Sequence, residues 1–112
     1  MAQLEGKAAI VTGGARGVAK GVATAFVKAG ASVLIVDREG DLGRETAAEL
    51  TALGGKVAFL EVDLANRAAL PGIVDAALAH FGKLDILVNA AQASRQLLLA
   101  ETPDEAMDVS FD

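Results

Sequence analysis

A run of small residues near the start of the chain has the composition of a phosphate-binding turn. The apolar segment 8–12 leads into residues 12–19, TGGARGVA, and helical periodicity follows at once. The first N–H groups of a helix lack internal partners and the helix dipole is positive at that end, so such a unit attracts anions. Glycines such as Gly13 and Gly17 let the main chain approach a diphosphate. A plain tight turn would use the same small residues, so the glycines alone leave both interpretations open.

Asp37 adds a carboxylate 20 residues after Gly17, directly behind the apolar run 33–36. In a dinucleotide-binding fold this position reaches the adenosine ribose, whose hydroxyls donate to the carboxylate. A carboxylate there also repels a 2′-phosphate, which favours NAD over NADP, whereas Arg16 or Arg38 could pair with such a phosphate. The alternative interpretation of Asp37 is a solvated loop acid or a helix cap.

Two further polar residues, Asp63 and Asn89, follow apolar runs and are expected at the carboxyl ends of strands, where open α/β sheets bind ligands. Asp63 either contacts adenine or caps the next helix. Asn89 is expected mainly to brace the loop of the neighbouring strand. His80 is expected on a helix surface, and Glu61 with Asp63 lacks the partners of a metal site. The chain has no cysteine, which excludes disulfides and thiolate zinc sites.

These residues need a scaffold in which strands and helices alternate. Four short apolar runs predict strands at 8–12, 32–36, 57–62 and 86–89. The runs are continuous rather than alternating, which is typical of parallel strands buried on both faces. The order predicts an α/β, Rossmann-type, doubly wound parallel sheet with strand order 3-2-1-4 and flanking helices.

Apolar periodicity predicts the intervening helices. Gly30, Gly54 and Gly82 are expected to end them. Pro71 is either the first residue of the third helix or a kink in its first turn, and a fourth helix is expected from Thr102. The stripes expected to face the sheet are Val18, Val22, Phe26 and Val27 in the first helix, Leu42, Ala47, Leu50 and Leu53 in the second, and Val74, Ala77, Leu78 and Phe81 in the third.

The overall composition restricts the class of protein. The length of 112 residues, without a linker or repeat, predicts one domain over 1–112. A hydrophobic share of 53% with 22% charged residues argues against disorder. The net charge of −5 argues against a nucleic-acid partner. The N-terminal residues are polar and no apolar run is long enough for a signal peptide or a membrane span. We therefore expect no membrane partner and a cytoplasmic location.

Together these segments resemble the short-chain dehydrogenase/reductase family over essentially the whole chain, as the N-terminal portion of a longer protein. The family's turn is Thr-Gly-x-x-x-Gly-x-Gly, and here Ala19 replaces the last glycine. Asp37 matches the NAD-selecting acid of the family, and Asp63-Leu64 matches the pair placed against adenine. The run 84–89 is typical of the family, and residues 89–92, Asn-Ala-Ala-Gln, stand where it has Asn-Asn-Ala-Gly.

The resemblance implies an oxidoreductase that transfers a hydride between a nicotinamide cofactor and a small-molecule alcohol or carbonyl substrate, with NAD expected rather than NADP. The family's proton transfer uses a Ser, a Tyr and a Lys in Tyr-x-x-x-Lys spacing. The chain has no tyrosine, so these groups are expected beyond Asp112 and residues 1–112 alone are expected to be inactive, with no catalytic residue. The cofactor-binding residues that the resemblance implies are Gly13, Ala15, Arg16, Gly17, Val18, Asp37, Arg38, Asp63, Leu64, Asn89, Ala90 and Ala91.

Two other functions remain open. A stand-alone nucleotide-binding or regulatory module would share the turn and the carboxylate without catalysis. A methyltransferase-like Rossmann domain also places an acid after its second strand, although its turn opens differently. In residues 1–112 alone, the strand at 86–89 forms an uncovered edge that further strands would flank in the complete fold, so this piece is expected to self-associate or aggregate. The parent enzyme is expected to be a homo-oligomer.

Overall fold

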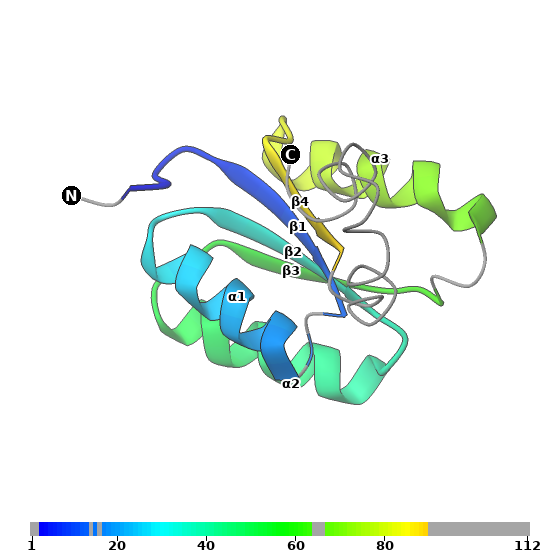
Figure 1. The fold of residues 1–112 in the computed structure, drawn as a ribbon, viewed down its shortest axis with the longest axis horizontal. Helices are drawn as coiled ribbons and strands as arrows, with labels where there is room; N and C mark the ends of the chain where they lie inside the picture. The colour runs from blue at the N-terminus through cyan, green and yellow to red at the C-terminus, as the bar shows by residue number, and fades with distance from the viewer. Residues whose placement is uncertain (1–2, 14, 16, 64–66, 90–112) are drawn as a thin grey trace, which may run out of the picture.

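The computed structural model describes residues 3–13, 15, 17–63 and 67–89. Strands and helices alternate through this part of the chain (Figure 1), and the helix expected from Thr102 lies outside it. The elements are β1 (Ala8–Thr12), α1 (Gly17–Lys28), β2 (Ser32–Asp37), α2 (Gly40–Ala52), β3 (Val57–Glu61), the short 3-10 helix η1 (Arg67–Ala69), α3 (Leu70–Phe81) and β4 (Ile86–Asn89).

The strands form one parallel sheet in the order β3-β2-β1-β4, as the sequence predicted. Val11 at the centre of β1 pairs with Ile35 of β2 on one side and with Val88 of β4 on the other. Helices α1 and α2 cover one face of this sheet and α3 covers the other (Figure 1). The Rossmann-type, doubly wound fold is therefore confirmed.

The sheet has a hydrophobic core on each face, because successive side chains of a strand point in opposite directions. Val11, Val33 and Ile35 pack beneath α1 and α2. Ile10 and Leu34 pack beneath α3. All of these side chains are at most 1% exposed, which explains why the strands read as continuous apolar runs.

The most buried face of α1 lies one position further along the helix than the stripe of Val18, Val22 and Phe26. The buried residues of α1 are Ala19, Ala23 and Val27. Val27 was expected there and is buried, Val22 and Phe26 are partly buried against the core, and Val18 is 80% exposed. The prediction for Val18 was wrong because large apolar residues dominate a sequence pattern, whereas a helix close to a sheet needs small side chains at the contact.

Helix α3 shows the same kind of shift. The buried residues of α3 are Ile73 and Ala77. Of the expected stripe, Ala77 is buried and Phe81 packs against the core, whereas Val74 and Leu78 remain 41% and 44% exposed. Pro71 is the second residue of the helix rather than the first, and no helical hydrogen bond is lost there. Gly82 ends the helix in a left-handed conformation, as expected.

Helix α2 lies very close to β3. The buried residues of α2 are Gly43, Thr46 and Leu50. Leu50 was expected there, but Leu53 is 54% exposed because the helix ends before it. A Cβ atom on Gly43 would collide with the ring of Phe59. The helix thus approaches the strand through a position without a side chain. No helix in the described part of the chain is long and apolar enough to cross a membrane.

Gly43→Ala is expected to lower the free energy of unfolding by about 2 kcal/mol, because the added methyl group forces the Phe59 ring or the helix to move. Gly21→Ala, in α1, is the matched control, since no atom lies within 4 Å of the added methyl group. It should stabilise the protein by about 0.5–1 kcal/mol through helix propensity. Urea unfolding of the complete protein measures both changes. Equal effects at the two positions would contradict the close contact.

Candidate functional site

The polar residues predicted from the sequence gather at the carboxyl edge of the sheet. Thr12, the last residue of β1, pairs with Val36 of β2 and with Asn89 of β4. Asp37 pairs with Glu61 at the end of β3. The register therefore brings the turn after β1, the carboxylate after β2 and the amide of β4 to one edge, where open α/β sheets bind ligands.

Two glycines of the turn after β1 adopt left-handed backbone conformations. Gly13 has φ +69 and donates its N–H to the carbonyl of Val36 at 2.6 Å. Gly17 has φ +65 at the start of α1, and no atom of the described residues, apart from its chain neighbours, lies within 4 Å of a Cβ atom built there. Ala15, between them, is fully buried. Both described glycines of the turn are therefore left-handed, and no other described residue fills the space beside Gly17.

Asp37 points its carboxylate at this turn. Oδ2 accepts the N–H of Ala15 at 3.2 Å, and Oδ1 accepts the N–H of Glu39 at 3.0 Å. The residue is 9% exposed, so it is not a solvated loop acid. It is not the N-cap of α2 either, because Glu39 occupies that position. A carboxylate has about four acceptor sites, and these two hydrogen bonds leave room for further donors.

Asn89 is joined to the end of β1. The hydroxyl of Thr12 donates to Asn89 Oδ1 at 2.8 Å, with the carbonyl of Val88 as a second acceptor at 3.3 Å. This is the bracing contact expected of Asn89, and the hydroxyl of Thr12 is its donor. The sequence signal for Thr12 was its place between a buried strand and a glycine.

The loop after β3 lies beside the same edge. The N–H of Val62 donates to the backbone carbonyl of Asp37 at 3.0 Å, which places the neighbouring Asp63 near the end of β2. Asp63, Arg38 and Val18 are all exposed. The predicted site residues Arg16, Leu64, Ala90 and Ala91 lie outside the described residues.

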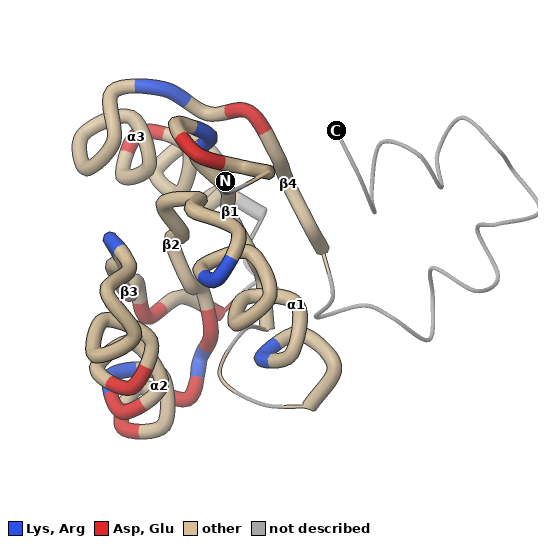
Figure 2. Tube along the Cα trace, turned by 90° about the vertical axis from the view of Figure 1, so that its left-hand side faces the viewer, with Lys and Arg blue, Asp and Glu red and all other residues tan. Residues whose placement is uncertain are grey.

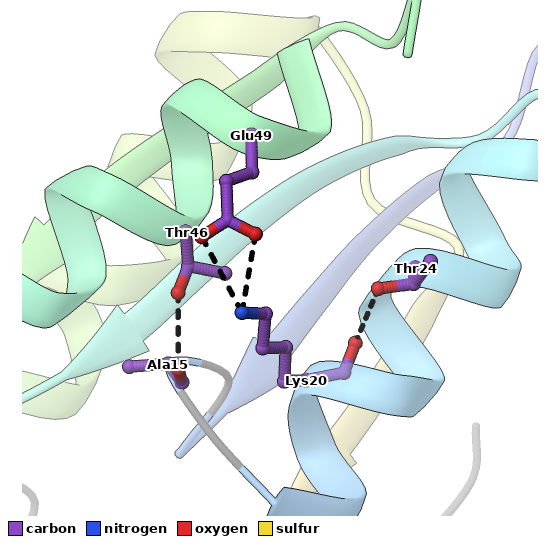
Figure 3. Close-up of polar contacts among 5 residues, drawn as sticks. All are labelled: Ala15, Lys20, Thr24, Thr46 and Glu49. Atoms are coloured by element: carbon purple, nitrogen blue, oxygen red, sulfur yellow. Dashed lines mark hydrogen bonds and ion pairs between the residues drawn. The ribbon is translucent and has the colours of Figure 1, made fainter. Parts of the chain in front are cut away.

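Two contacts from α2 to the turn and to α1 were not predicted (Figure 3). The hydroxyl of Thr46, which is fully buried, donates to the carbonyl of Ala15 at 3.0 Å. Lys20 of α1 forms an ion pair with Glu49 of α2 at 3.2 Å. No local sequence signal marks Thr46, because its partner Ala15 lies 31 residues away.

Acidic and basic residues lie close together at α2 and at the end of β3 (Figure 2). Arg44 pairs with Asp41 at 2.8 Å and with Glu61 at 3.5 Å. The hydrogen bond that Arg44 donates to the Asp41 carboxylate is the main cause that raises the pKa of Arg44. All three side chains are well exposed, and such pairs contribute little to stability.

The opposite edge of the sheet carries a different carboxylate. Asp85 Oδ2 accepts the N–H of Ala8 at 2.9 Å, and the N–H of Asp85 donates back to the carbonyl of Ala8 at 2.8 Å. Lys83 lies 3.2 Å from the same carboxylate. The Ala8 hydrogen bond, supported by Lys83, holds the pKa of Asp85 below its ordinary value. Asp85 therefore fastens the start of β4 to β1, away from the glycine turn.

Known proteins share this sequence pattern. The model of the short chain dehydrogenase family matches residues 7–112. The chain belongs to the short-chain dehydrogenase family. The resemblance on the glycine turn and the following strands is thereby confirmed.

Among relatives of this short-chain dehydrogenase chain, 3beta-hydroxysteroid dehydrogenase 2 of Eggerthella lenta is 38% identical over 106 residues, which are 94% of this chain and 41% of the relative. The 7alpha-hydroxysteroid dehydrogenase of Escherichia coli K12 is 38% identical over 89 residues, which are 80% of this chain and 35% of the relative. In eight curated relatives that this chain matches, it spans 31% to 46% of their lengths.

Solved structures share the fold of this short-chain dehydrogenase chain. A short-chain dehydrogenase/reductase from Burkholderia phymatum, crystallised in complex with NAD, has a TM-score of 0.75 and 30% sequence identity, covering 80% of this chain and 32% of that one. A hydroxysteroid dehydrogenase from Escherichia coli has a TM-score of 0.74 and 38% identity, covering 77% of this chain and 35% of that one.

Proposed function

We propose that this chain is the cofactor-binding part of an NAD-dependent oxidoreductase. The observation that carries the proposal is the carboxylate of Asp37, which lies against the glycine turn at the start of α1. A turn that attracts a diphosphate and an acceptor for ribose hydroxyls then occupy one edge of the sheet. When bound, the nicotinamide cofactor supplies or takes up the hydride.

The residues at this edge fit a dinucleotide. Open space beside Gly17 leaves the main chain accessible to a diphosphate, and the N-terminus of α1 favours its negative charge. Two acceptor sites on Asp37 remain for the ribose hydroxyls. The other residues that we assign to the cofactor site are Gly13, Ala15, Arg16, Val18, Arg38, Asp63, Leu64, Asn89, Ala90 and Ala91.

Asp37 also carries the proposed preference for NAD. A 2′-phosphate on the adenosine ribose would lie next to this carboxylate, and the two negative charges would repel each other. The likeness to the Burkholderia phymatum protein, which was crystallised with NAD, agrees with this choice. Arg38 is exposed and follows directly, so it is the residue that a competing 2′-phosphate would pair with.

For the complete protein we propose hydride transfer with a small-molecule alcohol or carbonyl substrate, a homo-oligomeric assembly and a cytoplasmic location. The family membership supports the reaction class. Residues 1–112 contain no tyrosine, so the proton-transfer group of the family is assigned to sequence outside them.

Calorimetric titration of the complete protein with NAD, NADP and S-adenosylmethionine tests the proposal. We expect NAD to bind at least about tenfold more tightly than NADP, because repulsion next to a carboxylate shifts such equilibria by about 1.4 kcal/mol or more. S-adenosylmethionine should not bind. Binding of S-adenosylmethionine alone would overturn the proposal in favour of a methyltransferase-like domain. NAD binding without turnover of any alcohol or carbonyl would favour a non-catalytic module.

A further inference from the structure

The central residue of the glycine turn is held from both sides. The N–H of Ala15 donates to Asp37 Oδ2 at 3.2 Å, and the carbonyl of Ala15 accepts the hydroxyl of Thr46 at 3.0 Å. Ala15 and Thr46 are both fully buried. Both polar groups of one peptide residue therefore depend on side chains that come from β2 and α2.

Thr46 differs from the other threonines in the described helices. Thr24 donates to the carbonyl of Lys20 at 2.8 Å, and Thr51 donates to the carbonyl of Ala47 at 2.7 Å, in each case four residues back in the same helix. This is the usual local bond of a helical threonine. Thr46 instead reaches a carbonyl 31 residues away, in the turn (Figure 3).

We propose that Thr46 is a positioning residue for the cofactor, which holds the diphosphate-binding turn in its binding conformation through the carbonyl of Ala15. This rests on the proposed function, since it assigns Thr46 to the same site. Gly13 and Gly17 make the turn intrinsically flexible, because glycine has many accessible backbone conformations. A side-chain donor from the packed helix α2 restricts this freedom before any ligand arrives.

The hydrogen bond also protects a buried acceptor. Without the hydroxyl, the Ala15 carbonyl would face the interior with no donor, and a buried polar group without a partner is unfavourable. The turn would relieve this by moving its carbonyl towards water. A turn that is in the binding conformation only part of the time binds its ligand more weakly in proportion to that fraction.

Thr46→Val tests the proposal in the complete protein, because it removes the hydroxyl and keeps the shape. We expect the dissociation constant of NAD, measured by calorimetry, to rise about fivefold, which corresponds to the loss of one neutral hydrogen bond. The KM for NAD should rise by the same factor, with kcat at saturating NAD unchanged. Binding of ADP should weaken in parallel, while adenosine, which lacks the diphosphate, should bind as to the unchanged protein.

Thr51→Val is the matched control, since it makes the same change in the same helix at an exposed hydroxyl that bonds only within α2. It should leave the affinity for NAD unchanged. Thr46→Ser retains a donor and should bind NAD like the unchanged protein. Thr46→Cys has nearly the shape of the serine variant but a weak donor, so it should show most of the loss even where Thr46→Val fails to fold.

The outcomes separate this inference from the proposed function. If the unchanged protein binds no NAD, the proposed function is wrong. If it binds NAD and the valine variant binds equally well, Thr46 has no positioning role and the proposed function stands. Equal affinities for the serine and cysteine variants, or equal losses with adenosine and ADP, would also overturn the inference.

Discussion

Asp37→Ala is expected to weaken NAD binding by about a hundredfold. The change removes the acceptor that we assign to the ribose hydroxyls, and hydrogen bonds to a charged group contribute about 1.5–3 kcal/mol each. It also frees the N–H groups of Ala15 and Glu39, which the carboxylate now accepts. The loss of about 3 kcal/mol in binding free energy corresponds to that factor. Calorimetry with NAD on the complete protein measures it.

The same variant should change cofactor choice. Removing the carboxylate removes the repulsion of a 2′-phosphate, so the ratio of NAD to NADP affinity should fall by at least about tenfold. Asp41→Ala is the matched control, because Asp41 lies four residues further on and contacts Arg44 at an exposed pair. Its affinities for both cofactors should stay within about twofold of those of the unchanged protein. Loss of NAD binding in both variants would show that general negative charge, not Asp37, is responsible.

Loss of folding has to be distinguished from loss of the ribose contact. Asp37 is nearly buried, and alanine leaves the buried N–H of Ala15 without its acceptor, which is expected to lower the free energy of unfolding by about 1–3 kcal/mol. Urea unfolding of the variant gives this quantity separately. Where the alanine variant is too unstable to titrate, Asp37→Asn keeps the shape and removes the charge, and the cofactor ratio should still fall.

Strand positions and strand order were predictable because their physical cause is local. A strand buried on both faces is apolar at every position, and the run around Val33 to Val36 has no other good interpretation. The pairing order then follows from alternating elements and their usual connections. Only two strand ends differ from the predicted ones, each by one residue: β2 extends to Asp37, and β3 ends at Glu61.

The inward faces of the helices were less predictable because they depend on distance to the sheet. Val18 and Val74 look like core positions in the sequence, yet both are exposed, and the contacts are made by the smaller Ala19 and by Ile73. Gly43 is the extreme case, a contact position with no side chain at all. A hydrophobic pattern weights residues by size, whereas close packing rewards the residue that fits the available gap.

The residues of the candidate site also include some that the sequence could predict and some that it could not. The positions of Gly13 and Asp37 were predictable because they depend on residue type and on the place directly after a buried strand. Thr46 was not, since its role depends on a contact with Ala15 across 31 residues. No local pattern distinguishes a threonine that bonds its own helix, such as Thr51, from one that bonds a turn. Tertiary contacts of this kind become visible only in coordinates.

Gly17→Ala is expected to weaken NAD binding by about a hundredfold while lowering the free energy of unfolding by only about 1 kcal/mol. The small stability effect follows from φ +65, which costs a side-chain-bearing residue about 1–2 kcal/mol. The described part of the protein would tolerate the methyl group, since none of its atoms outside the neighbouring residues lies within 4 Å of it. A diphosphate bound to the adjacent main chain would not, because the methyl group occupies its space and weakens charge-assisted hydrogen bonds.

Gly82→Ala separates these two effects. Gly82 has φ +76, no protein atom lies within 4 Å of an added Cβ atom, and it precedes β4 at the opposite edge of the sheet from the turn. It should therefore show the same loss of stability, about 1 kcal/mol, with no change in NAD affinity. A plain tight turn predicts that the two variants behave alike in both urea unfolding and calorimetry. A phosphate-binding turn predicts that only the Gly17 variant loses the cofactor, because only there does the backbone have to meet a ligand.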